Sequence, residues 1–320
     1  MRWLVTGGAG YIGSVVAAQL LSADHDVVVA DDLSTGHQDA VPPGAAFHRC
    51  DVTEVGPLFE QWSFDGVLHF AARSIVGESV TDPALYWRNN VGGTLALLDT
   101  MRAHDVSRIV FSSTAATYGD SAHVPIDESA PTIPTSPYGA GKLAIDLALA
   151  DHARAYGMCA VSLRYFNVAG ALLHGQVGYG ERHRPETHLI PLALRSAAGE
   201  AGPLQLFGTD YPTPDGTCIR DYVHVVDLAD AHIRALSVGH PGEHRVINLG
   251  SGSGSSVREV LHAVEKVTGR SVPLNETGRR AGDPAVLVAS NTRAAHDLGW
   301  RPQRDLTQMV DDAWQFSRVG

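Results

Sequence analysis

Tyr138 and Lys142 carry a phenol and an ammonium group four residues apart, a spacing that places both on one face of a helix. Ser136 offers a hydroxyl for the helix cap and Pro137 the fixed φ of a first turn, so we expect a helix to begin here. An ammonium group beside a phenol lowers the phenol's pKa, which would make Tyr138 a base. The alternative is a half-buried tyrosine near a surface lysine, and the rest of the chain must decide.

A glycine-rich turn near the N-terminus indicates a dinucleotide site. The strand pattern at 3–5 runs into four glycines in overlapping G-x-x-G-x-x-G and G-x-G-x-x-G patterns: Gly7, Gly8, Gly10 and Gly13. A helix and a second strand (27–30) follow, and such glycines let a pyrophosphate approach the helix N-terminus. Asp31 ends that strand, where a carboxylate accepts hydrogen bonds from ribose hydroxyls. Asp32 would repel a 2′-phosphate, so NAD is favoured over NADP.

Strands alternate with helices through the first half of the chain, with further strand patterns at 47–50, 66–70, 108–111 and 160–166. This alternation predicts an α/β fold with a doubly wound parallel sheet, whose ligands bind at the carboxyl ends of the strands. The small side chains of Ala71 and Ala72 and the hydroxyl of Thr114 fall at that edge. Asp51 also follows a strand, and it either contacts an adenine amine or only caps a helix.

Composition and charge exclude several kinds of partner. The 320 residues predict two domains, or one large α/β unit with an appendage, and the net charge of -11 argues against nucleic acid or an anionic membrane. Cys50, Cys159 and Cys218 lie outside any C-x-x-C pattern, so we expect free thiols in a reducing compartment. No room for a signal peptide precedes the first motif and no apolar run approaches about 18 residues, so a soluble cytoplasmic protein is predicted.

Residues 171–187 combine glycine, histidine and charge without an apolar period, and they are predicted to form a long functional loop. His183 and His188 lack an H-E-x-x-H or comparable ligand spacing, so no metal site is expected there. Loop histidines are the better explanation.

In the second half of the chain, Asp227 is expected to cap a helix, and Arg280 and Asp283 belong to its densest basic stretch. That stretch is either a solvated surface feature or, near the ligand edge of a sheet, a clamp for a diphosphate. Further strands are expected at 204–208, 218–226 and 246–249.

Nine stretches of the chain match the patterns of a known family. Seven are VTGGAGYIGS (5–14), HFAARSIVGES (69–79), NNVGGT (89–94), FSSTAATYG (111–119), SPYGAGK (136–142), RYFNVAGA (164–171) and HLIP (188–191). The other two are FGTDYPTPDGTCIRDYVHVVDLA (207–229) and RRAGDPA (279–285). With these, the chain resembles the extended short-chain dehydrogenase/reductase family and, from end to end, its UDP-hexose 4-epimerase branch. The resemblance implies a Rossmann-type NAD-binding domain at 1–168, to which a segment of about 218–240 returns, and a smaller C-terminal α/β domain at 169–320 that binds a UDP-sugar.

The resemblance also implies a role for each residue of the site. Tyr138 is the catalytic base, Lys142 holds the nicotinamide ribose, and Thr114 bridges the sugar O4 and the tyrosine. The implied cofactor-binding residues are Gly7, Gly10, Tyr11, Ile12, Gly13, Asp31, Asp32, Leu33, Ser34, Thr35, Gly36, Asp51, Val52, Phe70, Ala71, Ala72, Asn89, Asn90, Ser112, Tyr138, Lys142 and Phe166. The implied substrate-binding residues are Thr114, Tyr138, Asn167, His188, Leu189, Leu206, Phe207, Arg220, Tyr222, Arg280, Asp283 and Leu287.

The implied activity is the NAD-dependent interconversion of UDP-galactose and UDP-glucose by transient oxidation at C4. A homodimer through the helices at 90–103 and 138–156 agrees with this family and with the apolar character of more than one face of each helix. A non-catalytic NAD-binding regulator is an alternative of another class, although Tyr138 and Lys142 are both present. A 4,6-dehydratase would need an acid pair directly after Thr114, where two alanines stand.

Three positions bear on how far the resemblance extends. Ser74 stands where some members carry a lysine near the cofactor, so that contact is not expected. His188 replaces an asparagine, which leaves its contact with uracil open. Leu287 is intermediate between the bulky and the small residues that set sugar size in this branch, so UDP-N-acetylhexosamine remains an alternative substrate. UDP-glucuronate is a separate alternative, which would need an extra charge for its C5 carboxylate that the sequence does not place.

Overall fold

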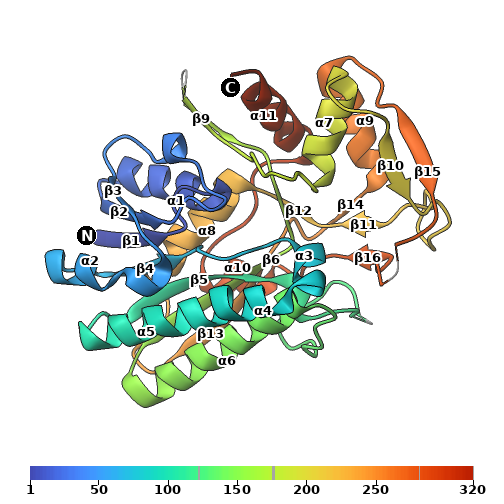
Figure 1. The fold of residues 1–320 in the computed structure, drawn as a ribbon. Helices are drawn as coiled ribbons and strands as arrows, with labels where there is room; N and C mark the ends of the chain where they lie inside the picture. Colours follow the sequence, from blue (N-terminus) through green and yellow to red (C-terminus); the bar gives the residue numbers. More distant parts are fainter. Residues whose placement is uncertain (122, 175–176, 281, 320) are drawn as a thin grey trace.

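The computed structural model describes residues 1–121, 123–174, 177–280 and 282–319. Within them, the main sheet has seven parallel strands in the order β13-β6-β5-β4-β1-β2-β3 (Figure 1). These strands are β1 (Arg2–Thr6), β2 (Asp26–Asp31), β3 (Ala46–Arg49), β4 (Gly66–His69), β5 (Arg108–Thr114), β6 (Cys159–Tyr165) and β13 (His244–Leu249). The predicted doubly wound sheet is confirmed. Residues 175–176 of the expected loop and residue 281 of the basic stretch lie outside the described residues.

Helices cover both faces of this sheet, which explains why its strands are apolar on both sides. On one face, one hydrophobic cluster joins the sheet to α1 (Tyr11–Ser22), α8 (Val225–Ala235) and α10 (Thr292–Asp297). On the other face, a second cluster joins it to α2 (Gly56–Gln61), α5 (Gly93–Ala103) and α6 (Pro137–Tyr156). Short helical segments connect these elements: η1 (Gln38–Ala40), η2 (Val52–Glu54), α3 (Val76–Thr81), α4 (Pro83–Tyr86), the π-helical η3 (Trp87–Gly92) and η4 (Ala115–Thr117).

The strand order reverses at β1, because β2 and β3 lie on one side of it and β4 on the other. Crossovers therefore leave β1 and β4 in opposite directions, and a crevice opens beyond their carboxyl ends. In doubly wound sheets, ligands bind in such a crevice.

A smaller part of the chain lies beyond this edge, on the yellow-to-red side of Figure 1. Its core is a third hydrophobic cluster between α7 (Leu189–Ala198), α9 (Val257–Thr268) and α11 (Leu306–Val319). Its strands form small sheets: β7 (Asn167–Ala169), β8 (Leu172–His174), β9 (Val177–Tyr179), β10 (Leu204–Phe207), β11 (Ile219–Arg220), β12 (Tyr222–His224), β14 (Ser255–Ser256), β15 (Leu274–Thr277) and β16 (Val286–Leu287).

The helix that carries Tyr138 and Lys142 begins as the sequence predicts. Ser136 caps α6 by accepting a hydrogen bond from the backbone N–H of Gly139 at 3.2 Å, and Pro137 is its first residue. Gly157 ends the helix in the left-handed conformation, with a φ of 71°.

Three expectations about elements are wrong in part. The expected loop at 171–187 contains the hairpin β8–β9. Asp227 does not cap α8, because the ring of His224 occupies the cap and accepts from the N–H of Val226 at 3.1 Å. The carboxylate of Asp227 instead accepts from the backbone N–H groups of Gln303 and Arg304.

The third difference concerns the returning segment, which extends past the expected 218–240. β13 pairs in parallel with β6 at the edge of the main sheet, so residues 244–249 also belong to that sheet. In the part of the chain that the structure describes, no helix has both the length and the apolar character needed to cross a membrane.

Candidate active site

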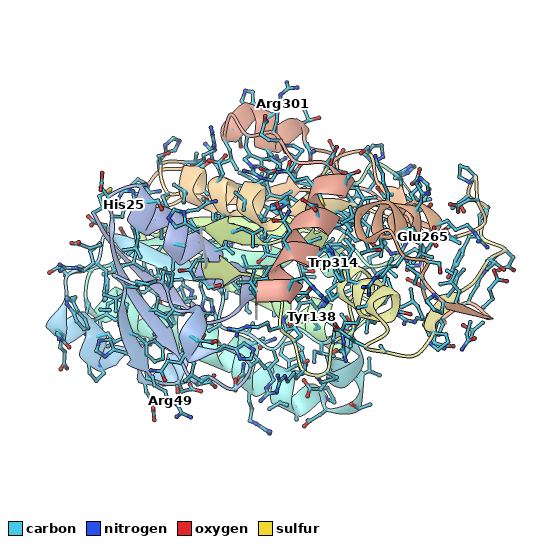
Figure 2. The ribbon with its side chains drawn as sticks, turned by 90° about the horizontal axis from the view of Figure 1, so that it is seen from above. His25, Arg49, Tyr138, Glu265, Arg301 and Trp314 are labelled. Carbon is cyan, nitrogen blue, oxygen red and sulfur yellow. The ribbon has the colours of Figure 1, made fainter. Side chains whose placement is uncertain are left out.

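A cavity of about 890 Å³ opens at the carboxyl edge of the main sheet. The ends of β1, β2, β4, β5 and β6 form one side of it, and the segment at 181–188 together with Arg280 and Asp283 forms the other. Seen from above, Tyr138 lies near the middle of the molecule, between the N-terminal half and the yellow-to-red elements (Figure 2). The cavity is therefore shared between the two parts of the chain.

The glycine-rich turn brings β1, α1 and β4 close together at this edge. Gly7 has a φ of +71°, and a Cβ there would lie 2.5 Å from the backbone nitrogen of Ala71. A Cβ on Gly13 would lie 2.3 Å from the carbonyl oxygen of Gly7. Gly10 at the N-cap offers no side chain to the first amides of α1, which are left for an anion at the cavity.

Asp31 is held in place at the end of β2. Its two carboxylate oxygens accept hydrogen bonds from the backbone N–H groups of Ala9 at 2.9 Å and Leu33 at 2.8 Å. Burial raises the pKa of Asp31, and these backbone hydrogen bonds oppose that shift. A carboxylate oxygen can accept a second hydrogen bond, so Asp31 can still receive a ribose hydroxyl from the cavity.

Thr114, Tyr138 and Lys142 meet on the wall of the cavity below the β5 edge. The hydroxyl of Thr114 lies beside the phenol of Tyr138 and lowers its pKa. The Nζ of buried Lys142 donates to the carbonyl oxygen of Ser112 at 2.7 Å and lies 5.9 Å from the ring centroid of Tyr138. The three side chains expected to act together are therefore neighbours.

The pKa shifts of this pair differ from the sequence expectation. Burial raises the pKa of Tyr138 to about 12, against the hydrogen bond from Thr114. Burial also lowers the pKa of Lys142 to about 7, against the charge of Asp146. The expectation that Lys142 lowers the phenol's pKa is wrong for the chain alone, because the lysine points to the carbonyl of Ser112 and burial disfavours both charges.

A buried ion pair fixes α6 against the sheet one turn after Lys142. Asp146 accepts from the Nε of Arg164 at 3.0 Å and from its Nη2 at 2.7 Å. The guanidinium group of Arg164, on β6, lies 4.9 Å from the ring centroid of Tyr118. Both charges are almost fully buried, so each needs the other, and the pair specifies how α6 sits on the sheet.

Two arginines lie at or near the far end of the cavity. The guanidinium carbon of Arg280 lies 3.9 Å from the ring centroid of Phe207, which holds a cation at the cavity wall. Arg220 forms an ion pair with Asp283, and Asp283 lines the cavity. The guanidinium group of Arg280 suits a diphosphate, whose oxygens it can grip bidentately, whereas Arg220 acts behind the wall by holding Asp283.

Comparison with known proteins decides the family. The model of the NAD dependent epimerase/dehydratase family matches residues 3–250. The chain belongs to this family.

The chain is similar over nearly its full length to two relatives and to one solved structure. The UDP-glucose 4-epimerase of Corynebacterium glutamicum is 53% identical over 99% of this chain and 96% of its own length. That of Streptomyces lividans is 54% identical over 98% of this chain and 95% of its own. The crystal structure of UDP-glucose 4-epimerase from Brucella ovis in complex with NAD has a TM-score of 0.94 and 46% identity, and covers 98% of both chains.

Most of the cofactor-binding residues expected for a member of this family line the cavity. They are Gly7, Gly10, Tyr11, Ile12, Gly13, Asp31, Asp32, Ser34, Thr35, Asp51, Val52, Phe70, Ala71, Ala72, Asn89, Ser112, Tyr138, Lys142 and Phe166. Leu33, Gly36 and Asn90 do not line it. Leu33 and Gly36 lie against the Asp31 carboxylate, and Asn90 bonds the backbone of Arg73. Asp51 lines the cavity and also caps η2, so the cap considered for it is confirmed, and its contact with an adenine amine stays a prediction.

The expected substrate-binding residues divide into two groups. Thr114, Tyr138, Asn167, His188, Arg280 and Asp283 line the cavity. Six others lie outside the cavity lining: Leu189, Leu206, Phe207, Arg220, Tyr222 and Leu287. Phe207 and Arg220 act behind the wall by supporting Arg280 and Asp283, whereas Leu189 and Tyr222 pack in or against the core of the smaller part. Leu206 is buried, and Leu287 pairs with Arg220 across β11 and β16.

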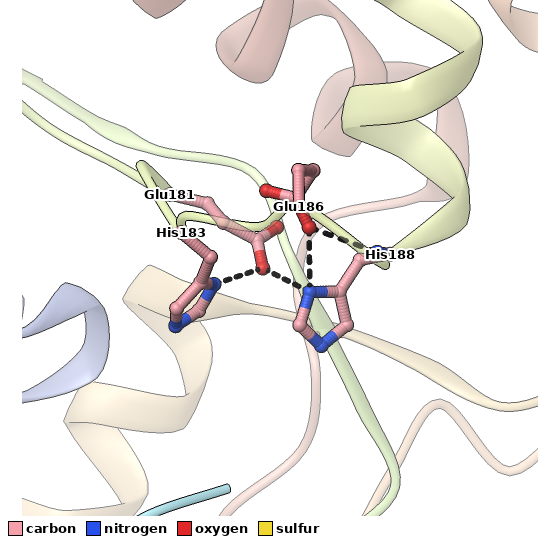
Figure 3. A group of neighbouring side chains, drawn as sticks. All are labelled: Glu181, His183, Glu186 and His188. Carbon is pink, nitrogen blue, oxygen red and sulfur yellow. Dashed lines mark hydrogen bonds and ion pairs between the residues drawn. The ribbon is translucent and has the colours of Figure 1, made fainter. Parts of the chain in front are cut away.

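The sequence interpretation assigned no site residue to the parts of the cavity wall at 73–77 and 181–187, although it expected a functional loop at 171–187. The first segment is part of a matched motif, but apart from the lysine contact rejected at Ser74 it had no assigned role. The second contains a group of four side chains, Glu181, His183, Glu186 and His188, whose ligand-type atoms all lie within 4.8 Å of one another (Figure 3). The pattern E-x-H-x-x-E-x-H was the available signal, and the search for H-E-x-x-H or a comparable ligand spacing did not recognise it.

Proposed function

We propose that this chain is an NAD-dependent epimerase that interconverts UDP-galactose and UDP-glucose by inverting C4. The observation that carries the proposal is one cavity with three components. The glycine-rich turn with Asp31 lies at one end, the Thr114–Tyr138–Lys142 group on the wall, and Arg280 and Asp283 opposite. The names of the similar proteins support the same activity.

In this mechanism, the chain's residues bind, orient and move a proton. Tyr138 accepts the proton of the C4 hydroxyl, and the hydroxyl of Thr114 aligns the two oxygens. Bound NAD would supply the acceptor and later donor of the C4 hydride, and its positive charge would favour the phenolate. Arg220, Asp283 and Arg280 would retain the UDP group while the sugar turns, so that its other face is presented and C4 is inverted.

Two rival interpretations, an elimination and a non-catalytic regulator, have less support in the cavity. After Thr114, the cavity wall continues with Ala116 on η4, which offers no acid or base for an elimination. A regulator without catalysis would not need the buried Lys142 beside Tyr138. UDP-N-acetylhexosamine remains a competing substrate, since Leu287 does not line the cavity and so does not set the sugar size there. UDP-glucuronate also remains an alternative substrate.

We also infer a homodimer through α5 and α6 and a cytoplasmic location. Leu95 on α5 and Leu147 and Tyr156 on α6 are large apolar side chains that are 39%, 61% and 55% exposed. They support an interface, because exposed apolar side chains gathered on neighbouring helices favour a partner. The three free cysteines support a reducing compartment.

The test is to follow purified protein with UDP-galactose by proton NMR, with UDP-N-acetylgalactosamine and UDP-galacturonate in parallel samples. UDP-glucose should appear. Its absence under conditions where NAD is bound would refute the proposed activity, and faster conversion of a parallel substrate would reassign the specificity.

A Tyr138→Phe variant tests the assigned base. The variant should lose about 10²- to 10⁴-fold in kcat, the range expected for removal of a general base. Its circular dichroism and its thermal midpoint should stay close to those of the unaltered protein. Undiminished turnover would show that another group takes the proton.

A further inference from the structure

Four side chains on the segment between β9 and α7 point toward a common centre (Figure 3). The Nδ1 of His183 lies 2.8 Å from Oε1 of Glu181. The Nδ1 of His188 lies 2.6 Å from that same oxygen and 2.9 Å from Oε1 of Glu186. Two imidazole nitrogens and two carboxylate oxygens thus converge from an eight-residue stretch.

The two carboxylates at this centre need a compensating positive charge, which a protonated imidazole or a bound cation can supply. The side chains of Glu181 and Glu186 are only 8% and 6% exposed. Across the ranges that the structure describes, neither carboxylate has a lysine or arginine within ion-pair distance, and the neighbouring Arg182 is paired with Asp39. Buried carboxylates are costly unless a positive charge compensates them. A divalent cation would balance two carboxylates while both imidazoles stay neutral.

We propose that Glu181, His183, Glu186 and His188 bind one divalent transition-metal ion of the zinc type. Two imidazole nitrogens and two carboxylate oxygens form a donor set that Zn²⁺ accepts, and four protein ligands complete a tetrahedral site. Across such an ion, ligand atoms lie about 3.4 Å apart, so the present hydrogen-bonded separations must widen by only about 0.5–0.8 Å. With no position left for water, the ion is structural.

The position of the ion in the fold indicates what it would stabilise. One ligand pair follows β9 and the other precedes α7, so the ion closes the loop of 181–188 on itself. This loop is a wall of the cavity, and Arg182 within it is bonded to Asp39 and to His37 on the nucleotide side. The metal site therefore stiffens the segment that spans the two parts of the chain.

A hydrogen-bonded network of two histidines and two glutamates is the competing account of the same geometry. The two accounts differ in whether the full-length protein with its bound cofactor takes up metal. The protein is stripped with a chelator and titrated with Zn²⁺ alone in competition with a chromophoric chelator, and with Mg²⁺ in a parallel series. We expect roughly one Zn²⁺ per chain with a micromolar or lower Kd, a rise in thermal midpoint with Zn²⁺, and none with Mg²⁺.

Variants of the proposed ligands, and Co²⁺ in place of Zn²⁺, test whether the ion binds at these four residues. His183→Gln and Glu181→Gln should each weaken Zn²⁺ binding at least about tenfold. The control His296→Gln alters an exposed histidine that is also paired with a carboxylate, and it should bind Zn²⁺ like the unaltered protein. In the unaltered protein, Co²⁺ should give the visible absorption of a four-coordinate ion, a readout that does not depend on how the variants fold.

Three outcomes would overturn the proposal: no bound Zn²⁺, equal affinity in His183→Gln, or a six-coordinate Co²⁺ spectrum. None of these measurements uses catalytic turnover, so they fail or succeed separately from the proposed epimerase activity.

Discussion

Tyr138 and Lys142 are placed where burial opposes a charge on either side chain. At a pKa of about 12, Tyr138 is protonated at neutral pH in the chain alone, so proton abstraction requires added positive charge beside it. Lys142, with a pKa of about 7, is itself only partly charged at neutral pH. The proposed base is therefore poised to respond to a cationic ring in the cavity, and it is not permanently active.

Lys142→Met should change the pH dependence of stability as well as turnover. Unfolding returns the pKa of Lys142 from about 7 to its ordinary 10.5. Between these values the unfolded state binds more protons, so this residue makes stability fall as pH falls from about 10 to 7. The variant should reduce the gain in unfolding free energy between pH 7 and pH 9 by up to about 2 kcal/mol.

Urea denaturation at the two pH values measures this effect, with the exposed Lys266→Met on α9 as the matched control. An equal gain in Lys142→Met and in the unaltered protein would show that the amine does not titrate in this range.

At the residue scale, the sequence predicted positions better than it predicted electrostatics. The spacing of Tyr138 and Lys142 on one face of a helix was sufficient to place them together. It could not show that Nζ would turn to the carbonyl of Ser112, because that contact depends on how α6 packs on β5. Nor could it show that Phe207 and Arg220 act through Arg280 and Asp283, since these contacts join strands β10 and β11 to a connection that is distant in sequence.

Among the elements, the segment from the end of β7 to α7 spans the two parts of the chain at the cavity. Tyr11 donates to the carbonyl oxygen of Gly170 at 2.6 Å, and Arg182 donates two hydrogen bonds of 2.8 Å to the carboxylate of Asp39. These contacts tie the segment to α1 and η1, which flank the glycine-rich turn. Because the segment lines the cavity, we expect these contacts to slow the departure of a dinucleotide.

Arg182→Ala should therefore speed the loss of NAD. The ion pair is partly exposed, which limits its contribution to about 0.2–1 kcal/mol, so NAD should dissociate up to about fivefold faster. Dilution of the holoprotein into an NAD-trapping enzyme measures the rate. Arg234→Ala breaks a comparable exposed pair with Asp230 on α8 and should leave the rate unchanged. Equal rates in both variants would show that the segment does not hold the cofactor.

His232 on α8 should contribute to unfolding in acid. It is fully buried against Phe70 and Tyr165, and burial lowers its pKa to about 4, against a hydrogen bond to the carbonyl of Leu228. Between about pH 6.5 and pH 4, His232 binds a proton in the unfolded chain but stays neutral in the folded chain. The resulting stability is complete above pH 6.5 and is lost as pH falls toward 4.

His232→Gln should therefore lose up to about 2 kcal/mol less than the unaltered protein between pH 7.5 and pH 5. Guanidinium denaturation at both pH values measures this difference. His262→Gln, exposed on α9, is the control, and a parallel loss in His232→Gln and the unaltered protein would contradict the assignment.

The elements themselves were predictable wherever the chain has a local period. The strands before the glycine-rich turn and before Thr114 are short apolar runs, and their order follows from alternation with helices. The hairpin β8–β9 was not predictable, because its strands are three residues each and Gly and charged residues obscure their alternation. The cap of α8 was misassigned because an Asp is the usual cap, whereas here the ring of His224 takes that place.

At the scale of the whole molecule, the helical face formed by α5 and α6 is where association is expected. Leu147→Glu would put a charge into an apolar interface and should convert the dimer to a monomer, whereas Val319→Glu at the end of α11 should not. Light scattering at micromolar concentration distinguishes a mass of 34.0 kDa from twice that value. If the unaltered protein is a monomer, the proposed interface is wrong.

The edge position of β13 has a consequence for the order in which the protein can fold. Six strands of the main sheet are complete by residue 165, but the seventh begins only at 244. During synthesis, β6 must therefore wait, with its hydrogen-bonding edge open, while about 80 further residues leave the ribosome at about 5–20 residues per second. An unpaired strand edge of this kind is prone to join other chains. The nascent chain is thus exposed to aggregation for several seconds, and a fragment ending near residue 168 would keep that hazard permanently.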